Sequence, residues 1–259
     1  MASWDAAQYL KFSDERTRPS RDLAAQIAIA EPQRVIDLGC GPGNSTQVLA
    51  DRWPEAEITG LDNSAEMVAR ARETQPERTW IVQGIEDWAA TEGAAYDVVF
   101  SNAALQWVPD HAALLPKLLS RVRSGGVFAM QMPANYGEHV HRVMRDLASS
   151  PGWRRWFPSG NVREWHSHSV EFYYDGLAAH ASRLNLWETE YLHVLSSAEA
   201  IVEWYRGTGM RPYLQAISDA AEQKRFAAEY LAGIRPAYPT RSDGRVLFPF
   251  RRLFAIAYR

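Results

Sequence analysis

Three glycines near the start of the chain form the group of residues best suited to shape a ligand site. They lie in Val35–Ser45, which reads VIDLGCGPGNS and has the spacing G-x-G-x-G. Glycine lets the backbone turn tightly and approach a ligand without a Cβ atom. A pyrophosphate-binding turn has the spacing G-x-G-x-x-G, and Asn44 stands at its third glycine. The turn therefore favours a nucleoside with a zwitterionic amino-acid tail.

Two further polar positions are expected where later strands end. Asp62 comes 23 residues after Gly39, where an acid can accept hydrogen bonds from both ribose hydroxyls. Asn102 opens a small and polar stretch, Ser101–Trp107, at the end of another expected strand. Because open α/β sheets bind ligands at the carboxyl ends of their strands, these features together predict a nucleoside site.

The elements that would position these residues alternate between strand and helix in the first half of the chain. Strands are expected at Arg34–Leu38, Glu57–Leu61, Thr79–Gln83, Tyr96–Ser101 and Val127–Met132. The intervening helices are expected to be capped by Asn44, Ser64 and Asp110, and the last of them to end near Arg123. This alternation predicts a parallel sheet with helices on both faces.

The second half of the chain has a different pattern. The sequence pattern of residues 134–180 predicts short helices and loops. The pattern of Leu184–Leu195 predicts a half-exposed antiparallel strand. Helices are expected at Ala198–Arg206 and from Pro212 to about Leu231, and a last strand at Leu253–Tyr258. With no flexible linker in the sequence, we expect one compact unit.

Composition excludes several classes of protein. A net charge of −3 argues against a general nucleic-acid binder, and the longest apolar run, Leu253–Tyr258, is far shorter than the roughly 20 residues of a membrane helix. Residues 1–30 show no signal-peptide pattern. The single cysteine, Cys40, excludes an internal disulfide and is expected to be a small packed residue. The sequence predicts a soluble, cytoplasmic protein.

The segments Val35–Ser45, Ile58–Ser64 and Tyr96–His111 resemble the motifs of class I S-adenosylmethionine-dependent methyltransferases. Residues 4–19, 103–111, 131–133 and 202–214 resemble the trans-aconitate 2-methyltransferases more closely, and Gly207–Tyr213 (GTGMRPY) is far more specific than the glycine turn. The resemblance runs from residue 4 to the C-terminus and is weakest across residues 134–180.

The resemblance implies a fold and a set of cofactor-binding residues. The fold is α/β, a Rossmann-like seven-stranded sheet with an antiparallel last strand, and helical insertions form a substrate cap. A single domain spans residues 1–259, with a cofactor-covering helical segment (1–30), a cofactor-binding core (31–133) and substrate-side insertions (134–180 and 197–245). The residues implied to bind S-adenosylmethionine are Asp37, Gly39, Gly41, Asn44, Asp62, Asn63, Ile85, Glu86, Asn102, Ala103 and Trp107.

One departure from the family concerns adenine. Many members carry an aspartate directly after the third strand, where this chain has Gln83-Gly84. Adenine recognition therefore passes to the backbone near Ile85, to Glu86 or to Asp87.

The implied substrate is a small tricarboxylate, which must be attracted locally by a protein of the same charge sign. Of the 28 basic residues three are lysine, leaving 25 arginines, and only arginine binds carboxylates in a bidentate way. Most of this excess is attributed to the nucleotide composition of the genome. We expect Arg211, Tyr213, Arg206, Tyr205, Arg18 and Arg16 to position the spectator carboxylates.

The expected reaction transfers a methyl group to a carboxylate and gives a monomethyl ester. A carboxylate with a pKa near ~4 is already ionised at neutral pH and needs no general base. The reacting carboxylate should lack a bidentate arginine, which would blunt its nucleophilicity.

Other functions and sites remain as alternatives. A different small polar or carboxylic acceptor, a nicotinamide dehydrogenase and a non-catalytic nucleoside sensor each fit part of the pattern. The pairs His139/His141 and His166/His168 could suggest a metal site, but neither segment favours the strand that would bring both rings to one face. Surface histidines are the preferred interpretation, and no metal is expected.

Overall fold

A seven-stranded mixed sheet with the order β3-β2-β1-β4-β5-β7-β6 organises the chain. The structure is a computed structural model and describes residues 13–93, 95–158 and 165–259, except for the side chains of residues 13–16. The strands are β1 (Arg34–Leu38), β2 (Glu57–Asp62), β3 (Thr79–Val82), β4 (Tyr96–Asn102), β5 (Val122–Pro133), β6 (Arg183–Leu195) and β7 (Val246–Tyr258).

The direction of the strands follows the expected pattern. Strands β1 to β5 pair in parallel, and β5 pairs with β7 in antiparallel register from Val127 opposite Tyr258 to Pro133 opposite Arg252. The Ser182 N–H donates to the Tyr258 carbonyl at 2.8 Å, so β6 begins beside the end of β7. The seven-stranded sheet with an antiparallel last strand is confirmed.

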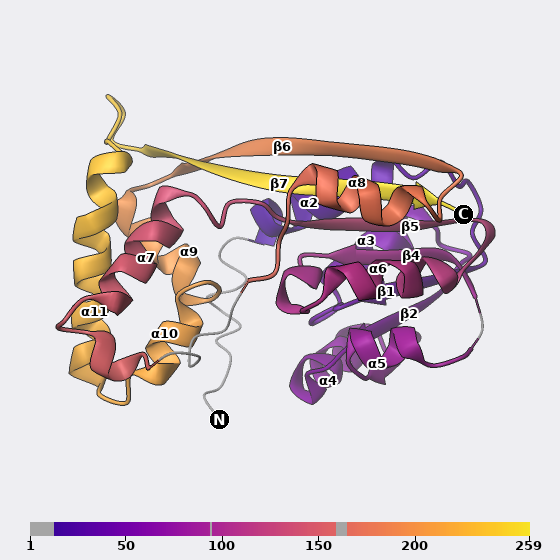
Figure 1. The fold of residues 1–259 in the computed structure, drawn as a ribbon, viewed down its shortest axis with the longest axis horizontal. Helices are drawn as coiled ribbons and strands as arrows, with labels where there is room; N and C mark the ends of the chain where they lie inside the picture. The colour runs from indigo at the N-terminus through magenta and orange to yellow at the C-terminus, as the bar shows by residue number, and fades with distance from the viewer. Residues whose placement is uncertain (1–12, 94, 159–164) are drawn as a thin grey trace. The chain divides into compact units, whose positions relative to one another are not determined.

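Helices connect the strands and surround the sheet. The structure has α2 (Ser13–Ala25), α3 (Asn44–Arg52), α4 (Ala65–Thr74), α5 (Ile85–Ala90), η1 (Leu105–Trp107), α6 (His111–Ser120), α7 (His139–Ser149), η2 (Arg154–Trp156), α8 (Val170–Ala178), α9 (Ala198–Arg206), α10 (Arg211–Ala216), α11 (Ala220–Ile234) and η3 (Arg235–Ala237). Figure 1 shows α6 and α8 in front of the strands and α3 behind them, so both faces of the parallel sheet are covered.

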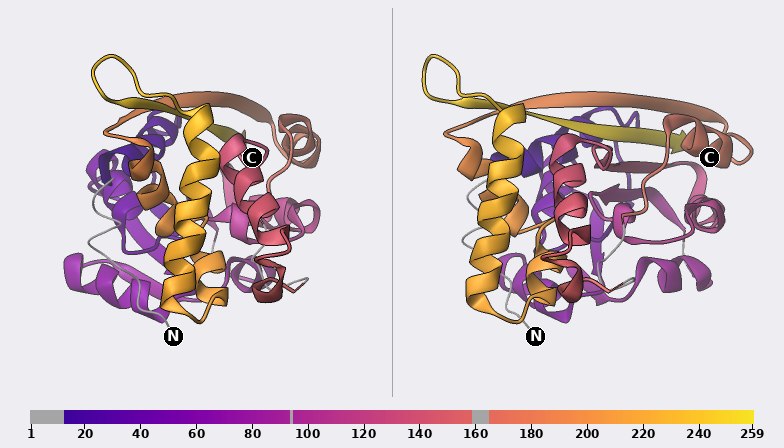
Figure 2. Two further views of the ribbon diagram at one scale, coloured as in Figure 1. Left: turned by 90° about the vertical axis from the view of Figure 1, so that its left-hand side faces the viewer. Right: turned by 60° about the vertical axis from the view of Figure 1, so that its left-hand side comes forward.

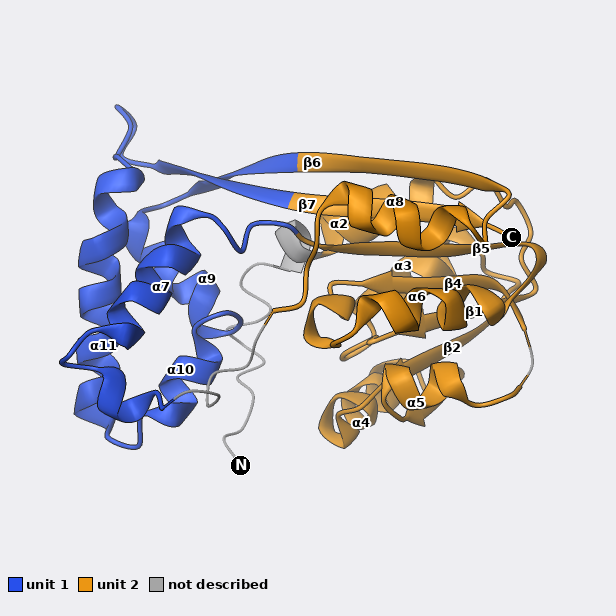
Figure 3. Cartoon of the chain, viewed as in Figure 1, with its two compact units in different colours: residues 1–15, 134–164, 190–251 blue, residues 16–133, 165–189, 252–259 orange. Residues whose placement is uncertain are grey.

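Contacts divide the chain into two compact units, coloured separately in Figure 3. Unit 2 comprises residues 16–133, 165–189 and 252–259 and contains the parallel sheet, whose strands β1 and β4 are almost fully buried. Unit 1 comprises residues 1–15, 134–164 and 190–251, and its helices α7, α9 and α11 enclose an aromatic core around Trp153, Tyr205 and Phe226. Figure 2 shows α7 and α11 lying side by side within this unit.

Several expected element boundaries were wrong. Asn44 does not cap α3: Gly43 takes that place with φ of +94°, so that Asn44 is already helical. The helix expected from Pro212 to Leu231 is two helices, because the Asp219 carboxylate accepts the Ala221 and Glu222 N–H groups and starts α11 anew. Ser64 and Asp110 do cap their helices.

Other elements differ in length. Helix α6 ends at Ser120 instead of near Arg123, because the chain enters β5 at Val122. Strand β7 begins at Val246, seven residues before the expected Leu253. In the described part of the chain, no helix is both long and apolar enough to cross a membrane.

Candidate active site

The glycine turn between β1 and α3 has the backbone that the sequence pattern predicts. Gly39, Gly41 and Gly43 have φ of +71°, +54° and +94°, a region that residues with a Cβ rarely adopt. A Cβ on Gly39 would lie 2.2 Å from the Ala104 Cβ, so the loop after β4 packs directly on the turn. A Cβ on Gly41 would meet nothing within 4 Å, so the turn leaves open space over this residue.

Asp62 connects the glycine turn to the end of β2. Its Oδ2 accepts the Gly41 N–H at 2.9 Å, and its Oδ1 accepts the Ser64 N–H at 2.8 Å. A carboxylate oxygen has two lone pairs, so each oxygen of Asp62 can accept one more hydrogen bond. The carboxylate thus holds the turn in place and still has acceptor capacity for a ligand.

Asp37 lies beneath the same turn and is fully buried. Its Oδ2 accepts hydrogen bonds from the Ser45 hydroxyl at 2.6 Å and the Thr46 hydroxyl at 2.7 Å, both in the first turn of α3. Its Oδ1 has no hydrogen-bond partner among the described residues. Burial raises the pKa of Asp37 to about 6, against the lowering effect of the two hydroxyl groups.

The end of β4 forms the next part of this sheet edge. Ala103 has φ of +53°, although it is not a glycine, and its N–H donates to the Gln131 carbonyl on β5 at 2.8 Å. Such backbone strain costs about 1–3 kcal/mol and is found mainly at functional sites. The Oδ1 atom of Asn102, next to it, is buried without a hydrogen-bond partner in the described part of the chain.

The remaining predicted cofactor residues lie around this edge. Ile85 begins α5 and is buried, with its Cδ1 3.8 Å from where a Gly39 Cβ would be, whereas Glu86 and Asp87 are exposed. Asn63 is exposed, Asn44 half-buried, and Trp107 packs edge-to-face on Trp165 with ring centroids 5.3 Å apart. The structure places Ile85 against the turn and leaves the adenine alternatives open.

Cys40 lies inside the turn and is 3% exposed. It packs with Val68, Ala71 and Trp80, and burial raises the pKa of its thiol. The expectation of a packed residue is confirmed, and the high thiol pKa excludes a thiolate nucleophile at neutral pH.

The predicted substrate-positioning residues of unit 1 lie on α9 and α10. Tyr205 is almost fully buried, accepts a hydrogen bond from the Asn135 amide at 3.2 Å and lies 3.3 Å from His141 Nε2. The Arg206 Nε lies 3.2 Å from a Glu203 oxygen. Arg211 begins α10, and no ion pair among the described residues includes it.

The two arginines predicted in the N-terminal part belong to α2. Arg18 is exposed, with its Nε 3.8 Å from an oxygen of Asp22 one turn later. The side chain of Arg16 lies outside the described residues.

Helix α7 adds residues that the sequence analysis missed. The Arg145 guanidinium lies 4.4 Å from the centre of the Tyr136 ring, and its Nη1 donates to the Tyr136 carbonyl at 2.9 Å. Burial raises the pKa of Tyr213 to about 12, with a further rise from Tyr136 and an opposing effect of Arg145. Arg145, like Arg211, is in no ion pair within the described ranges.

His141 corrects the interpretation of the histidines as surface residues. It is 5% exposed, and burial together with Arg145 lowers its pKa to about 3. A Cβ on Gly209 would lie 2.9 Å from the Tyr205 ring and 3.4 Å from the His141 ring, so the Gly207–Gly209 turn rests on this buried pair. The signal for Arg145 was its position four residues after His141, on the same face of one helix.

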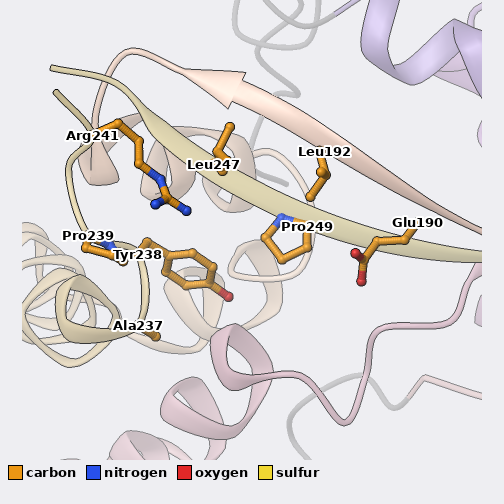
Figure 4. A pocket seen from close by; sticks show the side chains of 8 residues that line it. All are labelled: Glu190, Leu192, Ala237, Tyr238, Pro239, Arg241, Leu247 and Pro249. Carbon is orange, nitrogen blue, oxygen red and sulfur yellow. The ribbon is translucent and has the colours of Figure 1, made fainter. Parts of the chain in front are cut away.

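A cavity of about 400 Å³ in unit 1 lies elsewhere, between β6, β7 and the segment after α11 (Figure 4). Its lining residues are Glu190, Leu192, Ala237, Tyr238, Pro239, Arg241, Leu247 and Pro249. None of the predicted site residues is among them. Across the described residues, no group of three or more His, Cys, Asp or Glu side chains could hold a metal ion.

Comparison with known proteins identifies the family. Residues 35–126 match the family profile described as "Methyltransferase domain". The chain is 50% identical to the trans-aconitate 2-methyltransferase of Azoarcus sp. (strain BH72) and 48% identical to that of Rhodopseudomonas palustris (strain BisB18). Both alignments cover 100% of this chain and of the relative.

Solved structures show the same fold at low sequence identity. The YcgJ protein from Bacillus subtilis has a TM-score of 0.61 and 13% identity over 93% of this chain and 99% of its own. Haemonchus contortus phosphoethanolamine N-methyltransferase 2, solved with S-adenosylhomocysteine, has a TM-score of 0.56 and 14% identity over 93% of this chain and 52% of its own. By its full-length similarity to the curated relatives, the chain belongs to the trans-aconitate 2-methyltransferase family.

Proposed function

We propose that this protein is an S-adenosylmethionine-dependent carboxyl O-methyltransferase that converts trans-aconitate to its monomethyl ester in the cytoplasm. The observation that carries the proposal is the 50% identity over the full length of a relative with that name. The substrate is then a small molecule, and neither nucleic acid nor a membrane is involved.

The edge of the sheet in unit 2 suits this cofactor chemically. S-adenosylmethionine carries a sulfonium and an ammonium cation, and the edge contains acceptors. These are the Asp62 carboxylate and the Oδ1 atoms of Asp37 and Asn102, which have no hydrogen-bond partner among the residues that the structure describes. The open space over Gly41 accommodates a ligand against the backbone. A dinucleotide pyrophosphate is anionic, and the Asp37 carboxylate at the start of α3 disfavours it, which weakens the dehydrogenase alternative.

The resemblance to the family supports a role for each of the individual residues. Gly39 and Gly41 hold the methionine part, Asp62 accepts from the ribose hydroxyls, and Asn102 lies beneath the sulfonium. Ile85 packs on the adenine side of the turn. The cofactor site is completed by Asp37, Asn44, Asn63, Glu86, Ala103 and Trp107.

On the substrate side, Arg211, Arg145 and Tyr213 hold the carboxylates that do not react. Both guanidinium groups lack an ion pair in the described part of the chain, and the raised pKa of Tyr213 keeps its hydroxyl protonated as a donor. Tyr205 and His141 support the turn that carries Arg211. The arginines proposed to attract the substrate also include Arg206, Arg18 and Arg16. Of these, Arg206 and Arg18 have acidic neighbours in the structure.

The methyl transfer needs positioning and no proton transfer. The cofactor supplies an electrophilic methyl group on a positively charged sulfur. A carboxylate oxygen forms the bond to the methyl carbon as the carbon–sulfur bond breaks and its electron pair stays on sulfur. Alignment of the three atoms can supply up to about 7–11 kcal/mol of the barrier. His141 is uncharged at neutral pH and is not required as a base.

The test is a methyl-transfer assay with labelled cofactor and a panel of di- and tricarboxylic acids, with mass spectrometry of the product. We expect trans-aconitate to give a monomethyl ester with the highest kcat/KM. Calorimetric binding of S-adenosylhomocysteine without transfer to trans-aconitate would point to another acceptor. No binding of S-adenosylhomocysteine would contradict the proposal as a whole.

A further inference from the structure

Two residues with amide side chains lie opposite each other near the carboxyl edge of the sheet in unit 2. Asn102 ends β4, and Gln131 lies opposite it in the parallel register with β5. Gln131 is fully buried, yet its Nε2 has no hydrogen-bond partner among the described residues, and neither has the Oδ1 of Asn102. An unsatisfied buried polar group destabilises the folded state and is rare in folded proteins. The pair therefore indicates a ligand that supplies the missing partners.

A neighbouring cation determines which way the Gln131 amide faces. Arg252 on β7 is 4% exposed, and its Nη1 donates to Gln131 Oε1 at 3.4 Å. The reverse orientation would place the NH₂ group against a guanidinium that has only donors. The oxygen of the amide thus faces Arg252, and its two N–H donors face away from it.

The amide pair is tied by the backbone to the glycine turn. The Gln131 carbonyl accepts the N–H of Ala103, the strained residue that follows Asn102. Ala104 comes next and packs on Gly39. Gln131 therefore lies on the strand that holds the loop packed on the turn to which the proposed function assigns the methyl donor.

We propose that the Gln131 side chain donates a hydrogen bond from Nε2 to the carboxylate that becomes methylated and orients it for attack. This inference rests on the proposed function. One carboxylate oxygen accepts from Gln131, and the other supplies the electron pair for the new bond to the methyl carbon. The electrons of the carbon–sulfur bond stay on sulfur, the carboxylate becomes a neutral ester, and no proton is moved.

A neutral amide suits this role better than an arginine. The Gln131 amide donates one hydrogen bond and brings no positive charge, whereas a bidentate arginine forms an ion pair that stabilises the carboxylate anion more strongly. Gln131 therefore orients the nucleophile with little loss of its reactivity. Arg252 acts through Gln131, as the residue that holds the amide in its orientation.

Two variants distinguish this role from a purely structural one. Gln131→Met keeps the side-chain volume and removes both the donor and the acceptor. Gln131→Glu keeps the shape and the oxygen facing Arg252 but replaces the donor by a second anionic oxygen. If Gln131 served only to pack and to accept from Arg252, Q131E would retain more activity than Q131M. A donor to the substrate carboxylate predicts the opposite order.

The experiment measures kcat and KM for trans-aconitate, the Kd of S-adenosylhomocysteine and the melting temperature. We expect kcat/KM to fall about 10- to 100-fold in Q131M and further in Q131E, with the Kd within twofold of wild type. Thr59→Val replaces a buried hydroxyl on β2 and is the control, expected to keep wild-type kinetics.

Three results would overturn the inference: activity of Q131M within threefold of wild type, Q131E at least as active as Q131M, or a parallel loss of S-adenosylhomocysteine affinity in both variants. An inactive wild-type protein would instead contradict the proposed function.

Discussion

Asp62 shows at the residue scale how one side chain can build a site and still have capacity for a ligand. Its two oxygens accept backbone N–H groups from Gly41 and Ser64, which brings the turn after β1 to the end of β2. The proposed function uses the remaining acceptor capacity to bind the ribose. On that proposal the carboxylate serves both the shape of the turn and the binding of the cofactor.

Replacing Asp62 by asparagine should weaken cofactor binding. An amide has one acceptor oxygen, so its NH₂ group would face one of the two N–H donors. We expect the Kd of S-adenosylhomocysteine to rise about 10- to 100-fold in calorimetry, as for the loss of a charged hydrogen bond. Asp51→Asn, on the exposed side of α3, is the control. Equal affinity in D62N and wild type would exclude Asp62 from the cofactor site.

Arg211 gives the corresponding prediction on the substrate side. Removing a guanidinium that holds a spectator carboxylate should raise the KM for trans-aconitate by tenfold or more in Arg211→Ala. The affinity for S-adenosylhomocysteine should stay within twofold, because the cofactor residues lie on other elements. Arg245→Ala removes an exposed arginine and should have no effect. Unchanged kinetics of R211A would remove Arg211 from the site.

At the scale of elements, α7 is the part of the chain whose role was not evident from its composition. It presents His141 and Arg145 one turn apart, so that one side chain is buried beneath the Gly207–Gly209 turn and the other stacks on Tyr136. The helix thus connects the loop after β5 to the start of α10 within unit 1. The proposed function assigns it to the substrate side as well as to the core.

Arg145→Met tests this assignment of α7. Loss of the guanidinium should raise the KM for trans-aconitate about tenfold, while S-adenosylhomocysteine binds as before. Arg145→Lys keeps the positive charge but not the planar guanidinium group, so its KM should lie between those of the wild type and R145M. Arg142→Met removes an exposed arginine from the same helix and serves as the matched control. If R145M and R142M have the same KM, Arg145 does not contact the substrate.

At the scale of the whole molecule, the two units contain buried groups with opposite responses to pH. In unit 1 the pKa of His141 is lowered from 6.5 to about 3, so the folded state binds fewer protons than the unfolded state between these values. Stability is therefore lost as pH falls below about 6.5. In unit 2 the pKa of Asp37 is raised from 3.8 to about 6, so its burial costs least at low pH and the cost grows as pH rises through that range.

Lowering the pH from 7.5 to 5 should consequently weaken unit 1 relative to unit 2. Each unit of pKa shift corresponds to about 1.4 kcal/mol, so the contribution of His141 at pH 5 is on the order of 2 kcal/mol. The protection of backbone amides against hydrogen exchange should then fall more in α7 and α9 than in β1 and β4. An equal change of protection in all four elements would contradict this prediction.

The sequence by itself determined the parallel half of the sheet and the glycine turn at the edge proposed to bind the cofactor, because these depend on local signals. Short buried strands, glycines with positive φ and polar residues directly after strands are all readable within a few residues. The bounds of β1 and α9 agree with the expected ones, and Asp62 lies against the glycine turn, where its Oδ2 accepts the Gly41 N–H. Boundaries set by long-range contacts were missed, as at the start of β7, where residues 246–251 precede the register with β5 and β6 is the other neighbour of β7 in the sheet.

Only the tertiary structure decided which polar side chains are buried without partners and which arginines lack an ion pair. Gln131 and Arg252 lie far apart in the sequence and become neighbours only through the antiparallel pairing of β5 and β7. Likewise, the burial of His141 depends on the turn at Gly209 that packs on it. Hydrogen-bond satisfaction and desolvation are properties of the assembled surroundings of a group, and no local pattern in the chain encodes them.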